Sequence, residues 1–174
     1  GKALSSTNKI KRTMYFPTAK TSSFYSSSAS LRNSFSGSGG VFNNLPFGTV
    51  EVDTVTLSGI VEPRRRNLLI KLDCEGSELE ILKSSNEVLE RDDVDWIIEL
   101  LIGDDNKKEI FSYLIKFGYR GYLITNGGLV HEEKPLTLPS PDFKNRTLWK
   151  NHFFSKKNKE EVISASLGIF GQSL

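Results

Sequence analysis

Three acidic residues of this chain stand where a strand is expected to give way to a helix or loop, and carboxylates in such positions can do chemistry. Asp73 and Glu75 lie in the segment IKLDCEGSELEIL (residues 70–82), and Glu99 ends a second apolar run. A carboxylate near a helix N-terminus is stabilised by unpaired backbone N–H groups and can meet an amine, a hydroxyl or a cation arriving from solvent. The alternative is structural, with Asp73 as a helix cap and Glu75 as a first-turn acid. The local pattern alone favours this structural alternative.

Two strand–helix units are expected to position these acids. Residues 68–72 form a short, nearly continuous apolar run, which is typical of a strand buried in a parallel sheet. Leucines at helical spacing follow it, and they predict a helix with its charged side chains turned outward: Glu78, Glu80 and Lys83. The second unit combines a strand over 94–101 with an amphipathic helix over 107–117, which Gly118 is expected to end.

The remaining pattern completes an α/β fold. Further strands are predicted at 12–16, 49–57, 119–125 and 152–154, with a turn at 126–128. Asn158 and Glu161 resemble a capping box before a C-terminal helix over 160–170. Alternating strands and helices predict a mainly parallel sheet in which residues 68–72 and 96–101 form adjacent central strands. We expect one domain over 1–155, containing a mobile Ser/Gly-rich loop at 21–48, and a C-terminal helix or tail at 156–174.

Composition narrows the classes of partner and compartment. The formal net charge of the 174 residues is only +2, which gives no electrostatic reason to expect nucleic acid or a membrane surface as partner. No apolar stretch approaches the length of a membrane span, and the basic N-terminus lacks the apolar core of a secretory signal. The single cysteine, Cys74, fits a reducing compartment, so we expect a cytoplasmic protein.

The central motif resembles the signature of the FkbM-type methyltransferases. Five residues match that signature at the right spacing: Lys71, Asp73, Glu75, Gly76 and Glu78. Flanking segments are also similar to the family, from about residue 2 to residue 155, and include the strand that ends in Glu99, Gly118-Tyr119 and the strand 151–154. One departure is Ser58, where the family commonly has an aspartate after Thr-Leu.

The resemblance implies a class I, Rossmann-like methyltransferase fold and S-adenosylmethionine as methyl donor, with O-methylation of a small molecule or sugar. It implies that Asp73 and Glu75 face the donor's reactive end or the acceptor, and that Glu99 forms a second wall of the same site. Methyl transfer depends on positioning, helped by a base near the acceptor hydroxyl. No histidine or cysteine cluster supports a metal at these acids, so we expect none.

The donor site is the part of the family pattern that this sequence does not match. Upstream of the motif the only glycine cluster is 37–40, which follows a serine-rich segment rather than an apolar strand, so no cofactor-binding residues are assigned. We therefore expect the chain to represent the C-terminal part of the domain, without the first βαβαβ portion. Two functions stay open: a methyltransferase or part of one, and a non-catalytic remnant or partner-binding α/β module. An exposed sheet edge on the strand 68–72 would favour self-association.

Overall fold

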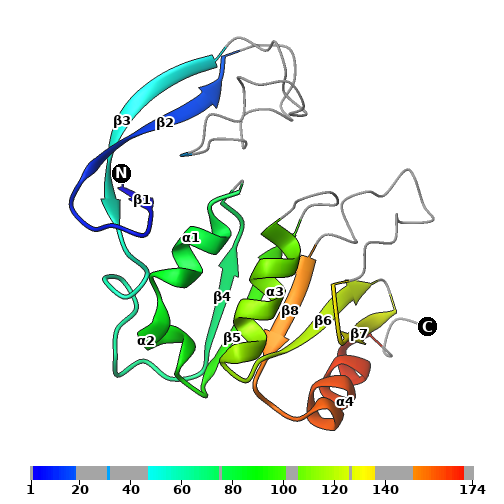
Figure 1. The fold of residues 1–174 in the computed structure, drawn as a ribbon. Helices are drawn as coiled ribbons and strands as arrows, with labels where there is room; N and C mark the ends of the chain where they lie inside the picture. The colour runs from blue at the N-terminus through cyan, green and yellow to red at the C-terminus, as the bar shows by residue number, and fades with distance from the viewer. Residues whose placement is uncertain are drawn as a thin grey trace. The chain divides into compact units, whose positions relative to one another are not determined.

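The computed structural model describes residues 2–18, 31, 47–74, 76–100, 106–125, 127–135 and 151–170. The chain forms two compact units (Figure 1). One unit comprises Gly1–Glu62 with Cys74–Asn86, and the other comprises Pro63–Asp73 with Glu87–Leu174. The predicted loop at 21–48 lies outside the described residues except for Leu31 and for Phe47 and Gly48, which begin a strand.

The first unit contains a three-stranded sheet and one short helix. The strands are β1 (Lys2–Leu4), β2 (Lys11–Pro17) and β3 (Phe47–Val55), in the order β1-β3-β2. β2 pairs antiparallel with β3, and β1 pairs parallel with it. The predicted strands at 12–16 and 49–57 are thus confirmed with small shifts in their bounds. β1 was not predicted, because three residues are too few to show an alternating pattern.

Glu80 fastens the helix of this unit, α1 (Glu78–Lys83), to the N-terminal segment. Its carboxylate accepts hydrogen bonds from the Ser6 hydroxyl and from the Arg12 guanidinium, the latter at 2.8 Å. The same Arg12 nitrogen donates to the buried hydroxyl of Ser5 at 3.0 Å. The Ser6 hydrogen bond, with Arg12 adding its charge, lowers the pKa of Glu80. A helix of one and a half turns is marginal by itself, so tertiary contacts of this kind hold it in place.

The second unit contains a mixed five-stranded sheet, which corrects the expectation of a mainly parallel one. The strands β4 (Leu68–Leu72), β5 (Val94–Glu99), β8 (Asn151–Ser155), β6 (Arg120–Thr125) and β7 (Gly128–Glu132) lie in that order. β4 and β5 are adjacent and parallel, as predicted, and the other three pairings are antiparallel. β4 is an edge strand of this sheet rather than a central one. β6 and β7 form a hairpin, and β8 runs in the direction opposite to both β5 and β6, which gives the three antiparallel pairs.

Two further helices follow β5 and β8 along the chain. α3 (Asn106–Lys116) and α4 (Lys159–Phe170) confirm the helices predicted at 107–117 and 160–170. Gly118 ends α3 with φ = +86°, and the side chain of Asn158 accepts the Glu161 N–H at 2.9 Å, so both predicted helix signals act as expected. The expected helix after β4 is instead two short helices, α1 and α2 (Asn86–Leu89).

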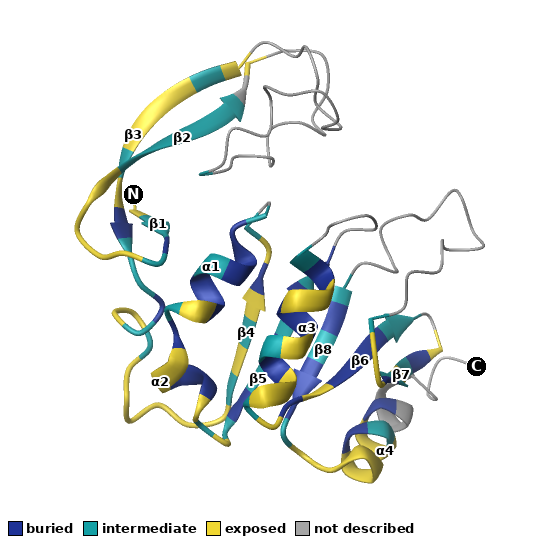
Figure 2. Cartoon of the chain, viewed as in Figure 1, coloured by how far each residue is buried: buried dark blue, intermediate teal, exposed yellow. Residues whose placement is uncertain are grey.

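The core of the second unit lies between α3 and one face of the sheet (Figure 2). Trp96, Ile98 and Phe154 are fully buried there, together with Ile110 and Leu114 of α3. The ring of Phe111 packs over Gly121 so closely that a Cβ at position 121 would lie 2.4 Å from its Cε2 atom. Phe111 also meets Phe154 edge to face, with ring centroids 5.6 Å apart. A glycine in β6 therefore allows an aromatic ring to lie directly on the strand backbone.

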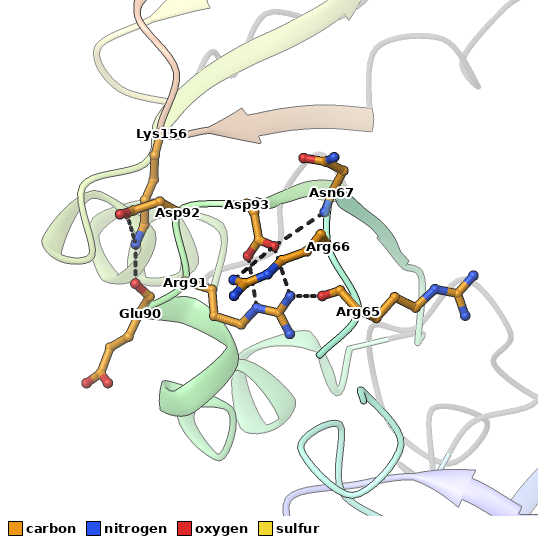
Figure 3. Close-up of polar contacts among 8 residues, drawn as sticks. All are labelled: Arg65, Arg66, Asn67, Glu90, Arg91, Asp92, Asp93 and Lys156. Atoms are coloured by element: carbon orange, nitrogen blue, oxygen red, sulfur yellow. Dashed lines mark hydrogen bonds and ion pairs between the residues drawn. The ribbon is translucent and has the colours of Figure 1, made fainter. Parts of the chain in front are cut away.

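Arg91 and Asp93 join the amino ends of β4 and β5 (Figure 3). The guanidinium of Arg91 donates to both carboxylate oxygens of Asp93, at 3.0 and 3.1 Å, and also to the Arg65 carbonyl. Asp93 in turn accepts the backbone N–H of Asn67 at 3.3 Å. The Arg91 hydrogen bonds and charge lower the pKa of Asp93 to about 2. The arginine run 64–66 is exposed, as expected of a solvated connection.

None of the helices in the described ranges is long and apolar enough to cross a membrane.

Candidate functional site

The acids Asp73 and Glu99 stand at the carboxyl ends of two neighbouring strands. Leu72 is the register partner of Ile98 in the parallel pair β4–β5; Asp73 directly follows the end of β4, and Glu99 is the last residue of β5. Because equivalent positions of parallel strands point to the same face, both acids belong to one face and one edge of the sheet. The face is the one opposite the buried side chains of Leu72 and Ile98. The sequence-based placement of these two acids at one sheet edge agrees with this register.

Lys71 holds the carboxylate of Asp73. Its Nζ atom lies 2.5 Å from Oδ2, and the two side chains are two positions apart on the same face of β4. Both are partly open to solvent, with 57% of the Lys71 side chain and 32% of the Asp73 side chain exposed. An exposed ion pair adds little stability. Its effect here is to fix the direction of the Asp73 carboxylate. The structure shows no cap by Asp73: the residue before α1 is Ser77, whose side chain makes no capping hydrogen bond.

The turn after Asp73 gives a structural reason for two other residues of the motif, Gly76 and Glu78. Gly76 adopts φ = +95°, a backbone conformation that favours glycine. Glu78, expected to point outward, is instead buried, and its carboxylate accepts the Cys74 N–H at 2.7 Å. Glu78 therefore shapes the turn. Glu75 lies outside the described residues, so its predicted role at the site stays a prediction.

Asn151, the first residue of β8, lies at the same edge of the sheet as Glu99. It is the register partner of Glu99 in the antiparallel pair β5–β8, so its side chain belongs to the same face as Glu99. Its Oδ1 atom is buried and accepts no hydrogen bond within the described structure. The sequence placed Asn151 in a closing strand but assigned it no role, because a single asparagine gives no signal of a site.

His152, the next residue, belongs to a buried polar cluster on the opposite face, the face covered by α3. Its Nδ1 atom lies 2.7 Å from Oε2 of Glu132 in β7, and both side chains are fully buried. Lys107, in the first turn of α3, is also buried; burial lowers the pKa of its ammonium group, and the negative charge of Glu132 acts in the opposite direction. The cluster connects α3 with β7 and β8. Sequence reasoning missed it because its members are far apart in the chain and carry no local motif.

The described part of the chain contains no group of three or more His, Cys, Asp or Glu side chains that could hold a metal ion. The edge presents the carboxylates of Asp73 and Glu99, which accept hydrogen bonds, and the amide of Asn151, which can accept or donate them, with Lys71 beside Asp73. Such a set can accept hydrogen bonds from hydroxyl or amino groups, and its carboxylates can take up a proton or stabilise a nearby positive charge.

Comparison with known proteins gives a family and no individual relative. The family described as "Methyltransferase FkbM domain" matches residues 4–121, which is more than half of the chain. The match occupies the N-terminal rather than the C-terminal part of the chain and is shorter than the similarity expected over 2–155; β8 and α4 lie outside it. No curated protein and no solved structure matches the chain. The matched range includes β4, β5 and the acids at their carboxyl ends, and on this evidence the chain belongs to the FkbM methyltransferase domain family.

Proposed function

We propose that this chain takes part in methyl transfer from S-adenosylmethionine to a hydroxyl group of a small molecule or sugar. The observation that carries the proposal is the register of β4 and β5, which brings Asp73 and Glu99 to one face at the carboxyl edge of adjacent parallel strands. Ligands of open α/β sheets commonly bind beyond this edge. Membership of the FkbM methyltransferase family supports the reaction type.

The residues of the chain fit the acceptor side of this reaction. The donor, when bound, would supply an electrophilic methyl group on a positively charged sulfur. Carboxylates at the sheet edge suit that charge, but the sequence has no apolar strand running into a glycine-rich turn to hold the nucleotide part of the donor. We therefore assign no donor-binding residues in this chain and derive only what its acids do.

Asp73 is the proposed proton acceptor. Its carboxylate, directed by Lys71, accepts a hydrogen bond from the acceptor hydroxyl and takes up the proton as that oxygen gains the methyl group. Glu99 accepts a hydrogen bond from a neighbouring group of the same acceptor and fixes its orientation. Glu75, two residues after Asp73 in the chain, is proposed to act beside it.

A radiochemical assay tests the proposal. The 174-residue chain is incubated with methyl-tritiated S-adenosylmethionine at millimolar concentration, so that weak donor binding does not hide transfer, and with a small-molecule extract. Asp73→Asn and Glu99→Gln should each reduce incorporation by about 10²- to 10⁴-fold, the usual contribution of an acid–base group. Asp92→Asn is the matched control, because Asp92 is 94% exposed at the opposite edge and pairs only with Lys156 among the described residues. Equal incorporation by wild type and by both acid variants, all folded, would contradict these roles.

A second candidate function is a partner-binding module without catalysis. β4 is an edge strand of its sheet, and Leu69 on it is 61% exposed, which suits pairing with another chain. The module has a distinct signature in the same assay, since it would transfer no methyl group at any donor concentration. Self-association through β4 would appear as a concentration-dependent mass in analytical ultracentrifugation. Leu69→Lys should lower that mass without affecting the fold.

A further inference from the structure

The chain between β3 and β4 passes from the first unit to the second after Glu62. Residues 62–67 belong to no helix or strand, and all six are exposed. They include the arginine run 64–66, which the candidate site does not use. Exposed connections of this kind are the usual places at which proteases cut a folded chain. An arginine side chain is also the group that the acidic specificity pocket of trypsin-like proteases binds.

The bonds after Arg65 and Arg66 are held in place by contacts at the amino ends of β4 and β5 (Figure 3). The carbonyl of Arg65 accepts a hydrogen bond from the guanidinium of Arg91. The N–H of Asn67 donates to Oδ2 of Asp93 at 3.3 Å, and Asn67 has φ = +55°. A protease binds its substrate extended and places the carbonyl of the cleaved bond in its oxyanion hole. Cleavage after Arg65 must therefore break the Arg91 hydrogen bond, and cleavage after Arg66 must straighten the backbone at Asn67.

The bond after Arg64 carries neither restraint. Pro63 and Arg64 form an exposed turn, and the carbonyl of Arg64 accepts no hydrogen bond within the described part of the chain. Arg91 itself is fixed, because its guanidinium also donates to both carboxylate oxygens of Asp93, at 3.0 and 3.1 Å. A hydrogen bond from a charged donor is stronger than a neutral one, so Arg91 keeps Arg65 in place while the turn before it can open.

We propose that the bond between Arg64 and Arg65 is a cleavage site for arginine-specific serine endoproteases, and that Arg91 and Asp93 restrict the cut to this one of the three bonds. Hydrolysis breaks the C–N bond and consumes one water, whose hydroxyl goes to the Arg64 carbonyl carbon and whose hydrogen goes to the Arg65 nitrogen. The cleavage site is independent of the proposed function, since it involves none of the acids at the carboxyl edge of the sheet.

The two pieces should stay together after the cut. Residues 1–64 keep β1, β2 and β3, and residues 65–174 keep α1, which belongs to the same compact unit as those strands. The carboxylate of Glu80 on α1 accepts hydrogen bonds from Ser6 and Arg12, which lie on the other piece. Cleavage after Arg64 is therefore expected to give a nicked, assembled protein rather than two separate pieces.

Limited digestion of the 174-residue chain with trypsin tests the inference. Mass spectrometry of the earliest products measures how often a new amino terminus appears at Arg65, at Arg66 and at Asn67. We expect the terminus at Arg65 to outnumber each of the other two at least tenfold. Native mass spectrometry of the same sample should find the piece that ends at Arg64 and the piece that begins at Arg65 in one complex.

Two variants separate the contacts of Arg91 from the mere presence of exposed arginines. Arg64→Gln should slow cleavage within the run at least tenfold, because the two remaining bonds are held. Arg91→Gln frees the Arg65 carbonyl, so the new terminus at Arg66 should become about as frequent as the one at Arg65.

Arg120→Gln is the matched control, because Arg120 also donates to backbone carbonyls, those of Lys156 and Lys157, and not to the arginine run. It should leave the cleavage pattern at residues 64–66 unchanged. Equal cleavage after all three arginines of the wild type, or an undiminished rate in Arg64→Gln, would overturn the cleavage site. Separation of the two pieces in native buffer would overturn their assembly.

Discussion

Nδ1 of His152 lies 2.7 Å from Oε2 of Glu132, and neither side chain is exposed to solvent. The pair joins β8 to β7 across β6, and Lys107 brings a buried positive charge from α3 to the same cluster. A carboxylate that holds one ring nitrogen of a histidine fixes the tautomer and the orientation of the ring. The cluster therefore sets the position of the first turn of α3 relative to the start of β8, next to Asn151.

Removing one member of this cluster should destabilise the protein more than replacing all three. Glu132→Leu leaves Lys107 and His152 buried without their acid, and loss of one partner from a buried charged pair typically costs about 3–5 kcal/mol. The triple variant Glu132→Leu, Lys107→Met, His152→Leu removes the three members of the cluster together and should recover most of that loss. Urea unfolding followed by circular dichroism measures both. A triple variant less stable than Glu132→Leu would show that the cluster contributes net stability.

The pH dependence of stability should show the contribution of Asp93 at acid pH. Hydrogen bonds from Arg91 lower the pKa of Asp93 from its ordinary value of 3.8 to about 2 in the folded state. Since the folded pKa is depressed, the contribution is complete above about pH 4 and is lost as the pH falls toward 2. The melting-temperature difference between wild type and Asp93→Asn should therefore be constant at neutral pH and shrink between pH 4 and 2. Thermal denaturation over this range is the measurement, and a constant difference down to pH 2 would contradict the assignment.

Gly121 should tolerate no side chain. A Cβ there would lie 2.4 and 2.7 Å from two ring atoms of Phe111 and 3.2 Å from Phe154, so Gly121→Ala forces α3 or its ring away from the sheet. Overpacking of this kind costs typically 1–3 kcal/mol, about the range expected here. Gly127→Ala is the control, because its Cβ would meet only the Thr125 hydroxyl oxygen at 3.9 Å. In the background of Phe111→Leu, the loss of stability caused by Gly121→Ala should be smaller. Chemical denaturation of wild type, the two single variants and the double variant measures this difference.

Local patterns in the sequence predicted most of the helices and strands. They did not predict the features that depend on which distant segments pair in space. The strand 68–72 and the helices near 107–117 and 160–170 have apolar spacing and end signals that depend only on neighbouring residues. The direction of β8 and the existence of β7 depend on which strands meet in space, which periodicity does not encode, so the sheet was wrongly expected to be mainly parallel.

The candidate site also combines residues that local pattern predicted with residues that depend on strand pairing. Asp73 and Glu99 were placed correctly at one edge because each ends an apolar run. Glu78 was expected on the surface because its position on the helix is that of a solvent-facing acid, yet the turn at Gly76 brings its carboxylate back to the Cys74 N–H. Asn151 and the cluster around His152 become apparent only through the register of β8 with β5 and β6.

Donor affinity gives the last prediction. The sequence has no apolar strand followed by a glycine-rich turn, the arrangement whose backbone N–H groups and adjoining acid would hold the donor's amino-acid and ribose groups. Each polar group of a buried ligand left without a partner costs about 1–3 kcal/mol, and about 1.4 kcal/mol is tenfold in affinity. In the proposed function Asp73 and Glu99 act on the acceptor, so they are not expected to supply those contacts. Isothermal titration calorimetry of the 174-residue chain with S-adenosylmethionine should therefore give no saturation at micromolar concentrations. Saturable micromolar binding in wild type, retained in Asp73→Asn, would show that the chain holds the donor through residues other than a glycine-rich turn.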